Sequence, residues 1–341
     1  MSGGEFDLIA RLVERMPPPG PQMRVASGDD AAVTEPRGTA AATTIDTIVE
    51  GVHFRLPGFP LEAVGRKALA AALSDLAAMG ADPGEAYVSL GAPESLGEDE
   101  LLRVGDGMAE VAAREGVTVA GGDVTRAPAL TLTVACVGYE RRGTELVTRA
   151  GAEPGDVLAV TGELGGAAGG LLVLDGLDDE GALRDRQRAV LASRQLDPRP
   201  RFAAGRALAD AGARAMIDIS DGLGADAGHL ARASAVRAEI DLGALPLGEG
   251  LVGLLGDERR ARELAAGGGE DFELLAAIGH ERLEEAVTAV EGLGGRLTQV
   301  GRGVQGEGVS IRDADGGEVE PRGFDHRPGR PRPGPRGGAH Q

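Results

Sequence analysis

The sequence predicts an α/β fold with two domains. Its 341 residues exceed the size at which a single hydrophobic core usually stops growing, roughly 250 to 300 residues. Short apolar runs typical of strands alternate with longer segments of helical periodicity through both halves of the chain. A turn-rich stretch at 148–156 separates the halves, so we place the first domain at 1–145, the second at 146–326 and a tail at 327–341.

The first domain begins with an amphipathic helix expected at 6–16, which ends at a run of prolines. Helices expected at 61–79 and 98–115 are each followed by a glycine that can close them, Gly80 and Gly116. Apolar runs predict the strands, at 23–27, 38–48, 85–91, 117–121 and 129–139.

The second domain repeats the alternation and is expected to form another layered α/β structure. Strands are expected at 157–160, 213–219, 236–242, 272–278 and 296–301. Helices are expected at 165–175, 199–211, 222–234, 257–266 and 280–291. The tail is rich in Arg, Pro and Gly and is predicted to be disordered and basic.

The composition excludes several classes of protein. A formal net charge of −19 opposes binding to nucleic-acid backbones and to anionic membranes. The single cysteine, Cys136, excludes an internal disulfide and a zinc cage of thiolates. No apolar run approaches 18 residues, and charges interrupt the apolar positions of the N-terminus, so we expect a cytoplasmic protein without a membrane span.

Carboxylates among apolar or glycine neighbours at the ends of predicted elements are the main chemical signal. A buried carboxylate is costly unless it is paired, hydrogen-bonded or bound to a cation, and basic residues are scarce nearby. Oxygen ligands without a Cys or His cluster favour Mg²⁺ or Mn²⁺. Each carboxylate taken alone could instead belong to a turn, a strand end or a helix cap. The five places are Gly28-Asp29-Asp30, Ile45-Asp46-Thr47, Ser74-Asp75-Leu76, Gly122-Asp123-Val124 and Asp218-Ile219-Ser220-Asp221.

Mg²⁺ held by a few carboxylates usually completes its shell with substrate phosphates, which points to a nucleotide. The chain has no P-loop, because Lys67 follows Gly65-Arg66 rather than the phosphate-binding loop. The glycine-rich turn at 161–170 does not match the spacing of a dinucleotide loop, so we assign it to close packing of a helix on a strand.

Lys67 is the one lysine among 35 basic residues, which indicates either a specific use of an ammonium or a chance survivor on a solvated helix face. It lies about 12 Å along its predicted helix from Asp75, so it could serve an adjacent subsite but not the same metal. His53 follows a strand in a glycine-containing loop, where a solvated histidine is the plainer alternative. Asp178 is expected in a solvated loop, where Asp178→Asn would be nearly silent.

The carboxylate motifs belong to a longer ordered set that resembles the thiamine-monophosphate kinase family, within the aminoimidazole ribonucleotide synthetase-like superfamily. The set runs through nearly the whole chain and is specific only in combination. It comprises Gly4-Glu5-Phe6, Gly28-Asp29-Asp30-Ala31, Asp46-Thr47 with His53-Phe54, Lys67-Ala68-Leu69 with Ser74-Asp75-Leu76-Ala77-Ala78-Met79-Gly80, Gly121-Gly122-Asp123, Asp218 with Ser220-Asp221-Gly222, and Gly269-Glu270-Asp271-Phe272-Glu273-Leu274.

The resemblance implies a two-domain aminoimidazole ribonucleotide synthetase-like fold that forms a homodimer through a mixed N-terminal sheet, with ATP and several Mg²⁺ ions in a cleft. It implies direct in-line transfer of the γ-phosphoryl group of ATP to thiamine monophosphate, without a catalytic base. The implied Mg²⁺ ligands are Asp30, Thr44, Ile45, Asp46, Asp75, Asp123, Asp218 and Asp221. The implied ATP contacts are Gly122, Asp123, Arg149 and Ser220, and the implied substrate contacts are His53, Glu270 and Pro321.

Two departures from the family pattern affect these roles. Ile45 stands where a hydroxyl residue is usual, so a ligand from this position must be its main-chain carbonyl. Pro321 stands where an aromatic residue often contacts the thiamine rings, and Phe324 is a candidate substitute. The alternatives are another ATP-using enzyme of the superfamily and a non-catalytic nucleotide-binding or metal-binding regulator. Selenophosphate synthetase and the hydrogenase maturation factor would need a cysteine near the N-terminus or at the C-terminus, and neither is present.

Overall fold

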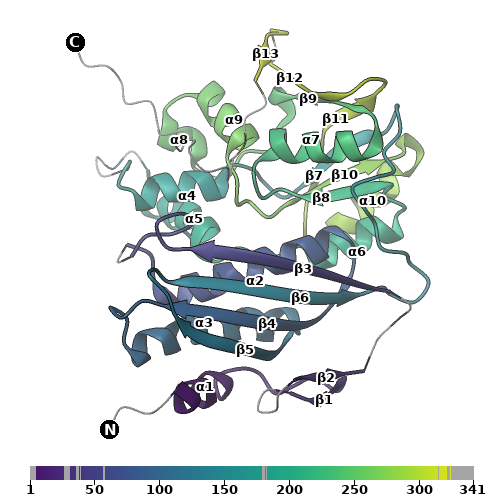
Figure 1. Ribbon diagram of the computed structural model, residues 1–341. Coiled ribbons are helices and arrows are strands. Elements are labelled where there is room, and N and C mark those ends of the chain that lie inside the picture. Colours follow the sequence, from purple (N-terminus) through teal and green to yellow (C-terminus); the bar gives the residue numbers. More distant parts are fainter. Residues whose placement is uncertain are drawn as a thin grey trace.

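The structure, a computed structural model, describes residues 5–26, 31–35, 38, 40–56, 58–178, 181, 183–313, 315–320 and 323. These residues form two units, each built on its own β-sheet (Figure 1). The N-terminal sheet has the strand order β3-β6-β4-β5, and the C-terminal sheet has the order β13-β12-β9-β11-β7-β10-β8. Strands and helices alternate in both units, which confirms the predicted α/β class.

The N-terminal sheet is covered by helices on one face only. Its strands are β3 (Ala41–Val49), β6 (Thr131–Tyr139), β4 (Asp82–Ala92) and β5 (Thr118–Arg126). Helices α2 (Leu61–Ala78) and α3 (Glu98–Glu115) pack behind the sheet in Figure 1. On the other face Ile45 exposes 67% of its surface among the described residues.

The smaller N-terminal elements are helix α1 (Glu5–Val13), which packs against α3, and strands β1 (Met23–Val25) and β2 (Val33–Thr34). Helices α2 and α3 match their predicted ranges closely, because an Ala/Leu pattern and a closing glycine define each of them. Strand β5 continues to Arg126, past the predicted end at 121, because pairing with β4 carries it through Gly121-Gly122.

The C-terminal sheet consists of seven strands: β7 (Val157–Thr161), β8 (Ala215–Asp218), β9 (Arg237–Asp241), β10 (Leu274–Ile278), β11 (Leu297–Val304), β12 (Gly308–Arg312) and β13 (Glu318–Val319). The strands β7, β8 and β10 are buried along their whole length. Apart from Thr161 and Asp218 at the strand ends, their residues are apolar, as expected for strands that are covered on both faces.

The helices of this unit are α4 (Gly166–Leu174), α5 (Asp185–Leu196), α6 (Phe202–Asp210), α7 (Leu223–Ser234), α8 (Leu251–Leu255), α9 (Glu258–Gly267) and α10 (Leu283–Glu291), with short 3₁₀ turns at Leu242–Ala244 and His280–Arg282. Helix α5 was not predicted from the sequence. Its residues are mostly polar, and only Leu191 and Gln195 are buried, so it lacks a clear apolar face.

Helix α2 connects the two units. It packs on the N-terminal sheet and also contacts α5, α6 and β8 of the C-terminal unit. Ala78, near the end of α2, belongs to a cluster of buried apolar residues that is otherwise formed by the C-terminal unit. Two polar residues of α2, Lys67 and Asp75, lie near residues of the C-terminal unit.

Candidate active site

Three of the predicted carboxylates converge where α2, β3 and β8 meet. The hydroxyl of Thr44, on β3, donates a hydrogen bond to Asp75 Oδ2 on α2. Asp46 alternates with Thr44 along β3, so both side chains point toward α2. Asp218 is the last residue of β8, which also packs against α2, and its side chain is buried. The fold thus places Asp46, Asp75 and Asp218, from three separate elements, around one junction, with Asp75 and Asp218 near enough for their charges to interact.

The carboxylates at this junction repel one another. Burial, and next the charge of Asp75, raises the pKa of Asp218 well above its ordinary value, although Ser74 and Arg149 oppose the rise. Burial raises the pKa of Cys136 to about 12, and the charges of Asp46 and Asp75 add to this rise. Cys136 is therefore an inert core thiol, and it lies opposite Thr44 in the pairing of β6 with β3.

The loop after β8 is held in place by a carboxylate that the sequence analysis missed. Asp226, on α7, accepts hydrogen bonds at its Oδ2 from the backbone N–H groups of Ser220, Asp221 and Gly222, at 3.0, 3.1 and 3.1 Å. Gly222 has a φ of +114°, which a residue with a side chain rarely adopts. Asp226 therefore orients the loop that carries Ser220 and Asp221.

Asp123 does not join the other carboxylates within one chain. It lies on β5, where it pairs with Ser89 of β4. Ser89 pairs with Thr133 of β6, and Thr133 pairs with Thr47 of β3. Asp123 is thus separated from Thr47, the residue after Asp46, by three strand spacings of about 4.8 Å, or about 14 Å. The expectation of one pocket for all the carboxylates is thus not met inside a single chain.

The remaining predicted contacts are distributed as follows. Gly122 lies beside Asp123 on β5. Arg149, in the connection between the units, is near enough to Asp218 to lower its pKa. Asp30 and Pro321 lie outside the described residues, as do Phe324 and the basic tail. Within the described part of the chain, no three acidic, histidine or cysteine side chains come close enough to hold a metal ion unaided.

A second cluster surrounds Glu270, which with His53 is one of the two predicted substrate contacts within the described residues. Its Oε1 lies 2.6 Å from Lys67 Nζ, and its Oε2 accepts a hydrogen bond of 2.8 Å from Gln195 Nε2. Lys67 Nζ also donates to the main-chain oxygen of His53 at 3.0 Å. The ring of His53 is fixed in turn, because its Nδ1 accepts from the backbone N–H of Val49 at 3.0 Å. His53, Lys67 and Glu270 therefore form one cluster.

The two clusters are neighbours. The backbone N–H of Glu270 donates to the main-chain oxygen of Ser220 at 2.8 Å, so the segment carrying Glu270 lies against the loop that follows Asp218. Burial tends to raise the pKa of Glu270, but the Lys67 ammonium, with Gln195 and His53, brings it below its ordinary value. Glu270 is thus an ionised carboxylate at physiological pH.

Three side chains show where sequence reasoning fell short. Lys67 is buried rather than on a solvated face, and its ammonium lies 2.6 Å from Glu270. Gln195 lies on the unpredicted helix α5, so no local signal marked it. The expectation for Asp178 was wrong: it is buried, pairs with Arg188 at 2.6 Å and accepts from Leu183 N–H at 3.0 Å, so it is unsuitable as a silent control.

Comparison with known proteins identifies the family of this chain. Residues 28–139 match the family model described as AIR synthase related protein, N-terminal domain, and residues 153–314 match its C-terminal domain. The thiamine-monophosphate kinase of Escherichia coli is 37% identical over 329 residues, which cover 96% of this chain and 99% of that protein. The chain belongs to the thiamine-monophosphate kinase family. The family member from Bacillus subtilis is 35% identical over 300 residues, with coverage of 87% and 90%.

Solved structures of the thiamine-monophosphate kinase family share the fold. The thiamine-monophosphate kinase of Stenotrophomonas maltophilia superposes with a TM-score of 0.79 at 38% identity, covering 92% of this chain and 96% of that one. The structure named AaThiL complexed with AMPPCP and TMP gives a TM-score of 0.75 at 33% identity, with coverage of 94% and 96%. The hydrogenase maturation protein HypE of E. coli, at 23% identity and a TM-score of 0.74, shares the fold alone. None of the described helices is both long and apolar enough to span a bilayer.

Proposed function

We propose that this protein transfers the γ-phosphoryl group of ATP to thiamine monophosphate and so forms ADP and thiamine diphosphate. The observation that carries the proposal is the pair of adjoining clusters at the domain junction. One gathers carboxylates that repel each other, and the other holds His53 and Glu270 against the first. Such a site suits two phosphorylated molecules that must be held close together.

The carboxylate cluster fits Mg²⁺. Its donors are oxygens: the Thr44 hydroxyl bonds to Asp75, and the charge of Asp75 helps to raise the pKa of Asp218. We assign Thr44, the carbonyl of Ile45, Asp46, Asp75, Asp218 and Asp221 as ligands, with Asp30 expected to join them. Mg²⁺ commonly takes one or two protein carboxylates and completes its shell with substrate phosphates, so an unaided protein cage is not required. Bound there, it would screen the phosphates and stabilise charge on the transferred group.

The chain's own residues supply binding and orientation. The attacking atom is a phosphate oxygen that is already anionic, so no side chain has to remove a proton from it. Arg149 and Ser220 are proposed to bind ATP, with Gly122 and Asp123 beside its phosphates. Asp226 holds the loop of Ser220 and Asp221 through three backbone hydrogen bonds, which orients these two residues before the substrate arrives.

We further propose that the site is completed in a homodimer. Within the described residues, β3 and β5 each have a free outer edge, and the exposed face of the N-terminal sheet carries Ile45. Pairing β3 of one subunit with β5 of another would bury these edges. It would also bring Asp123 of the partner subunit close to Asp46.

Subunit complementation tests this arrangement. Asp46→Asn and Asp123→Asn are each expected to be inactive alone. Mixed after unfolding and refolding together, they are expected to recover up to about a quarter of the parent activity, because half of the dimers are mixed and each contains one intact site. A mixture as inactive as its components would refute the shared site, and a monomeric parent protein would refute the dimer.

The reaction itself is tested with purified protein, ATP, Mg²⁺ and thiamine monophosphate, with the products separated by chromatography. We expect ADP and thiamine diphosphate in equal amounts. A protein that binds ATP but forms no thiamine diphosphate would contradict the proposal. That result would favour the alternative of a non-catalytic nucleotide-binding or metal-binding regulator.

A further inference from the structure

The only lysine of the chain joins the two units through a buried ion pair. Lys67 lies on α2 of the N-terminal unit and exposes 1% of its surface, and its ammonium lies 2.6 Å from Glu270 of the C-terminal unit. The same ammonium donates to the main-chain oxygen of His53 at 3.0 Å and lies 5.5 Å from the centre of the Phe59 ring. One side chain therefore holds a substrate contact from each unit.

Glu270 is held tightly and yet remains accessible. Besides Lys67, it accepts from the buried amide of Gln195, and its backbone adopts a left-handed φ of 71°. Such a conformation in a residue other than glycine persists only when the surroundings enforce it, and it is concentrated at functional sites. The side chain still exposes 27% of its surface, so part of the carboxylate can contact a ligand.

An ammonium suits this position for a physical reason. Its three N–H donors can point separately at a carboxylate, at a carbonyl oxygen and toward an aromatic face. The planar guanidinium of arginine has a fixed fork that does not match such partners. A buried cation is also costly unless it is fully paired. Because every other basic side chain of the Lys and Arg type in this sequence is arginine, a buried lysine at position 67 indicates a specific use of the ammonium.

We propose that Lys67 is a positioning residue for the phosphate acceptor. It fixes the Glu270 carboxylate and the His53 loop in the arrangement that binds the acceptor, and it makes that subsite depend on docking of the two units. The inference rests on the proposed function, because His53 and Glu270 are assigned there as contacts of thiamine monophosphate.

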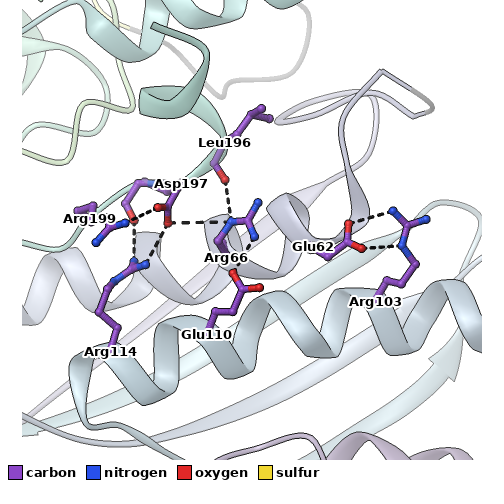
Figure 2. A network of polar contacts seen from close by, with 9 residues as sticks. Glu62, Arg66, Arg103, Glu110, Arg114, Leu196, Asp197 and Arg199 are labelled. Carbon is purple, nitrogen blue, oxygen red and sulfur yellow. Dashed lines mark hydrogen bonds and ion pairs between the residues drawn. The ribbon is translucent and has the colours of Figure 1, made fainter. Parts of the chain in front are cut away.

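The neighbouring residue Arg66 provides a matched control. Figure 2 shows its guanidinium between Glu110 of α3 and the end of α5, where it pairs with Glu110 at 2.8 Å and donates to the main-chain oxygen of Leu196 at 3.2 Å. Arg66 thus also connects α2 with the C-terminal unit, through Leu196 and Asp197 rather than through Glu270. If Lys67 only helped to dock the two units, substitutions of Lys67 and of Arg66 should have the same effect on the kinetics.

Steady-state kinetics of Lys67→Met and Arg66→Met test the proposal. We expect Lys67→Met to raise the KM for thiamine monophosphate by about tenfold or more, with the KM for ATP within about twofold of the parent. Arg66→Met is expected to leave both KM values within about twofold. An unchanged KM for thiamine monophosphate in Lys67→Met, or an equal rise in Arg66→Met, would overturn the positioning role. If Lys67→Met does not fold, Lys67→Gln, which keeps a donor, replaces it under the same criteria.

Hydrogen exchange on the proteins without substrate separates this inference from the proposed function. Amides at 49–56 and 267–273 are expected to exchange at least about tenfold faster in Lys67→Met than in the parent, and not in Arg66→Met. A parent protein that fails to phosphorylate thiamine monophosphate would refute the proposed function, and the exchange result would still decide the role of Lys67. Unchanged exchange in both segments would overturn that role.

Discussion

Replacing Arg201 by methionine should destabilise the segment that carries Glu270. Glu273, three residues further on, is 0% exposed, and its carboxylate accepts from Arg201 Nε at 2.8 Å and from Thr161 Oγ1 at 2.7 Å, with Arg194 Nη1 at 3.5 Å. Arg201→Met would leave this buried carboxylate with Thr161 and a longer contact to Arg194.

The expected loss follows from the burial of the pair. Removing one partner of a buried ion pair usually costs about 3 to 5 kcal/mol, and the remaining partners place this case near 3 kcal/mol. For a unit of this size each kcal/mol lowers Tm by about 2 to 4 °C, so a decrease of about 6 to 12 °C is expected by scanning calorimetry. The exposed pair of Arg302 with Glu239, at 2.9 Å, provides the control, because Arg302→Met should cost less than about 1 kcal/mol.

Combining Arg201→Met with Glu273→Gln tests the cause of that loss. The double variant removes the unpaired charge and should recover part of the lost stability. An Arg201→Met protein that melts within about 2 °C of the parent, or no more easily than Arg302→Met, would refute the assignment of a buried anion that depends on this arginine.

Two further predictions concern catalysis and pH. Asp46→Asn should lower turnover by more than about a hundredfold, since it removes a proposed Mg²⁺ ligand. Asp99→Asn, at a side chain that is 95% exposed, is the control and should stay within about twofold of the parent. Comparable rates in both variants would contradict the proposed site. The pKa of Glu270 in the folded protein lies below its ordinary value of 4.5, so its ion pair contributes stability that is present at neutral pH and lost on acidification. The free energy of unfolding of the parent in urea should therefore exceed that of Glu270→Gln by less at pH 4 than at pH 7. A difference that grows on acidification would contradict the pairing with Lys67.

The sequence was a good guide wherever a local pattern determined the element. Helices α2 and α3 were predicted almost to the residue, because apolar periodicity and a closing glycine act within each segment. Helix α5 was missed because its stability comes from packing against α4 and α2, which no local pattern records. The same limit applies to β5, whose glycine pair resembles a turn until pairing with β4 extends the strand.

The candidate site shows the same division. Asp46, Asp75 and Asp218 could be selected from the sequence, because a carboxylate among apolar neighbours near the end of a predicted element requires a partner. Their distance from Asp123 depends on strand order, which is a property of the assembled sheet. The contact between Lys67 and Glu270 likewise joins residues that only the docking of two units brings together.

The most direct test of the central claim is the co-crystal structure of this protein with Mg²⁺, a non-hydrolysable ATP analogue and thiamine monophosphate. The account predicts metal density between the analogue phosphates and the carboxylates of Asp46, Asp75 and Asp218, with the acceptor phosphate in line beside Glu270 and His53. Nucleotide bound elsewhere, with these carboxylates free of metal, would contradict it.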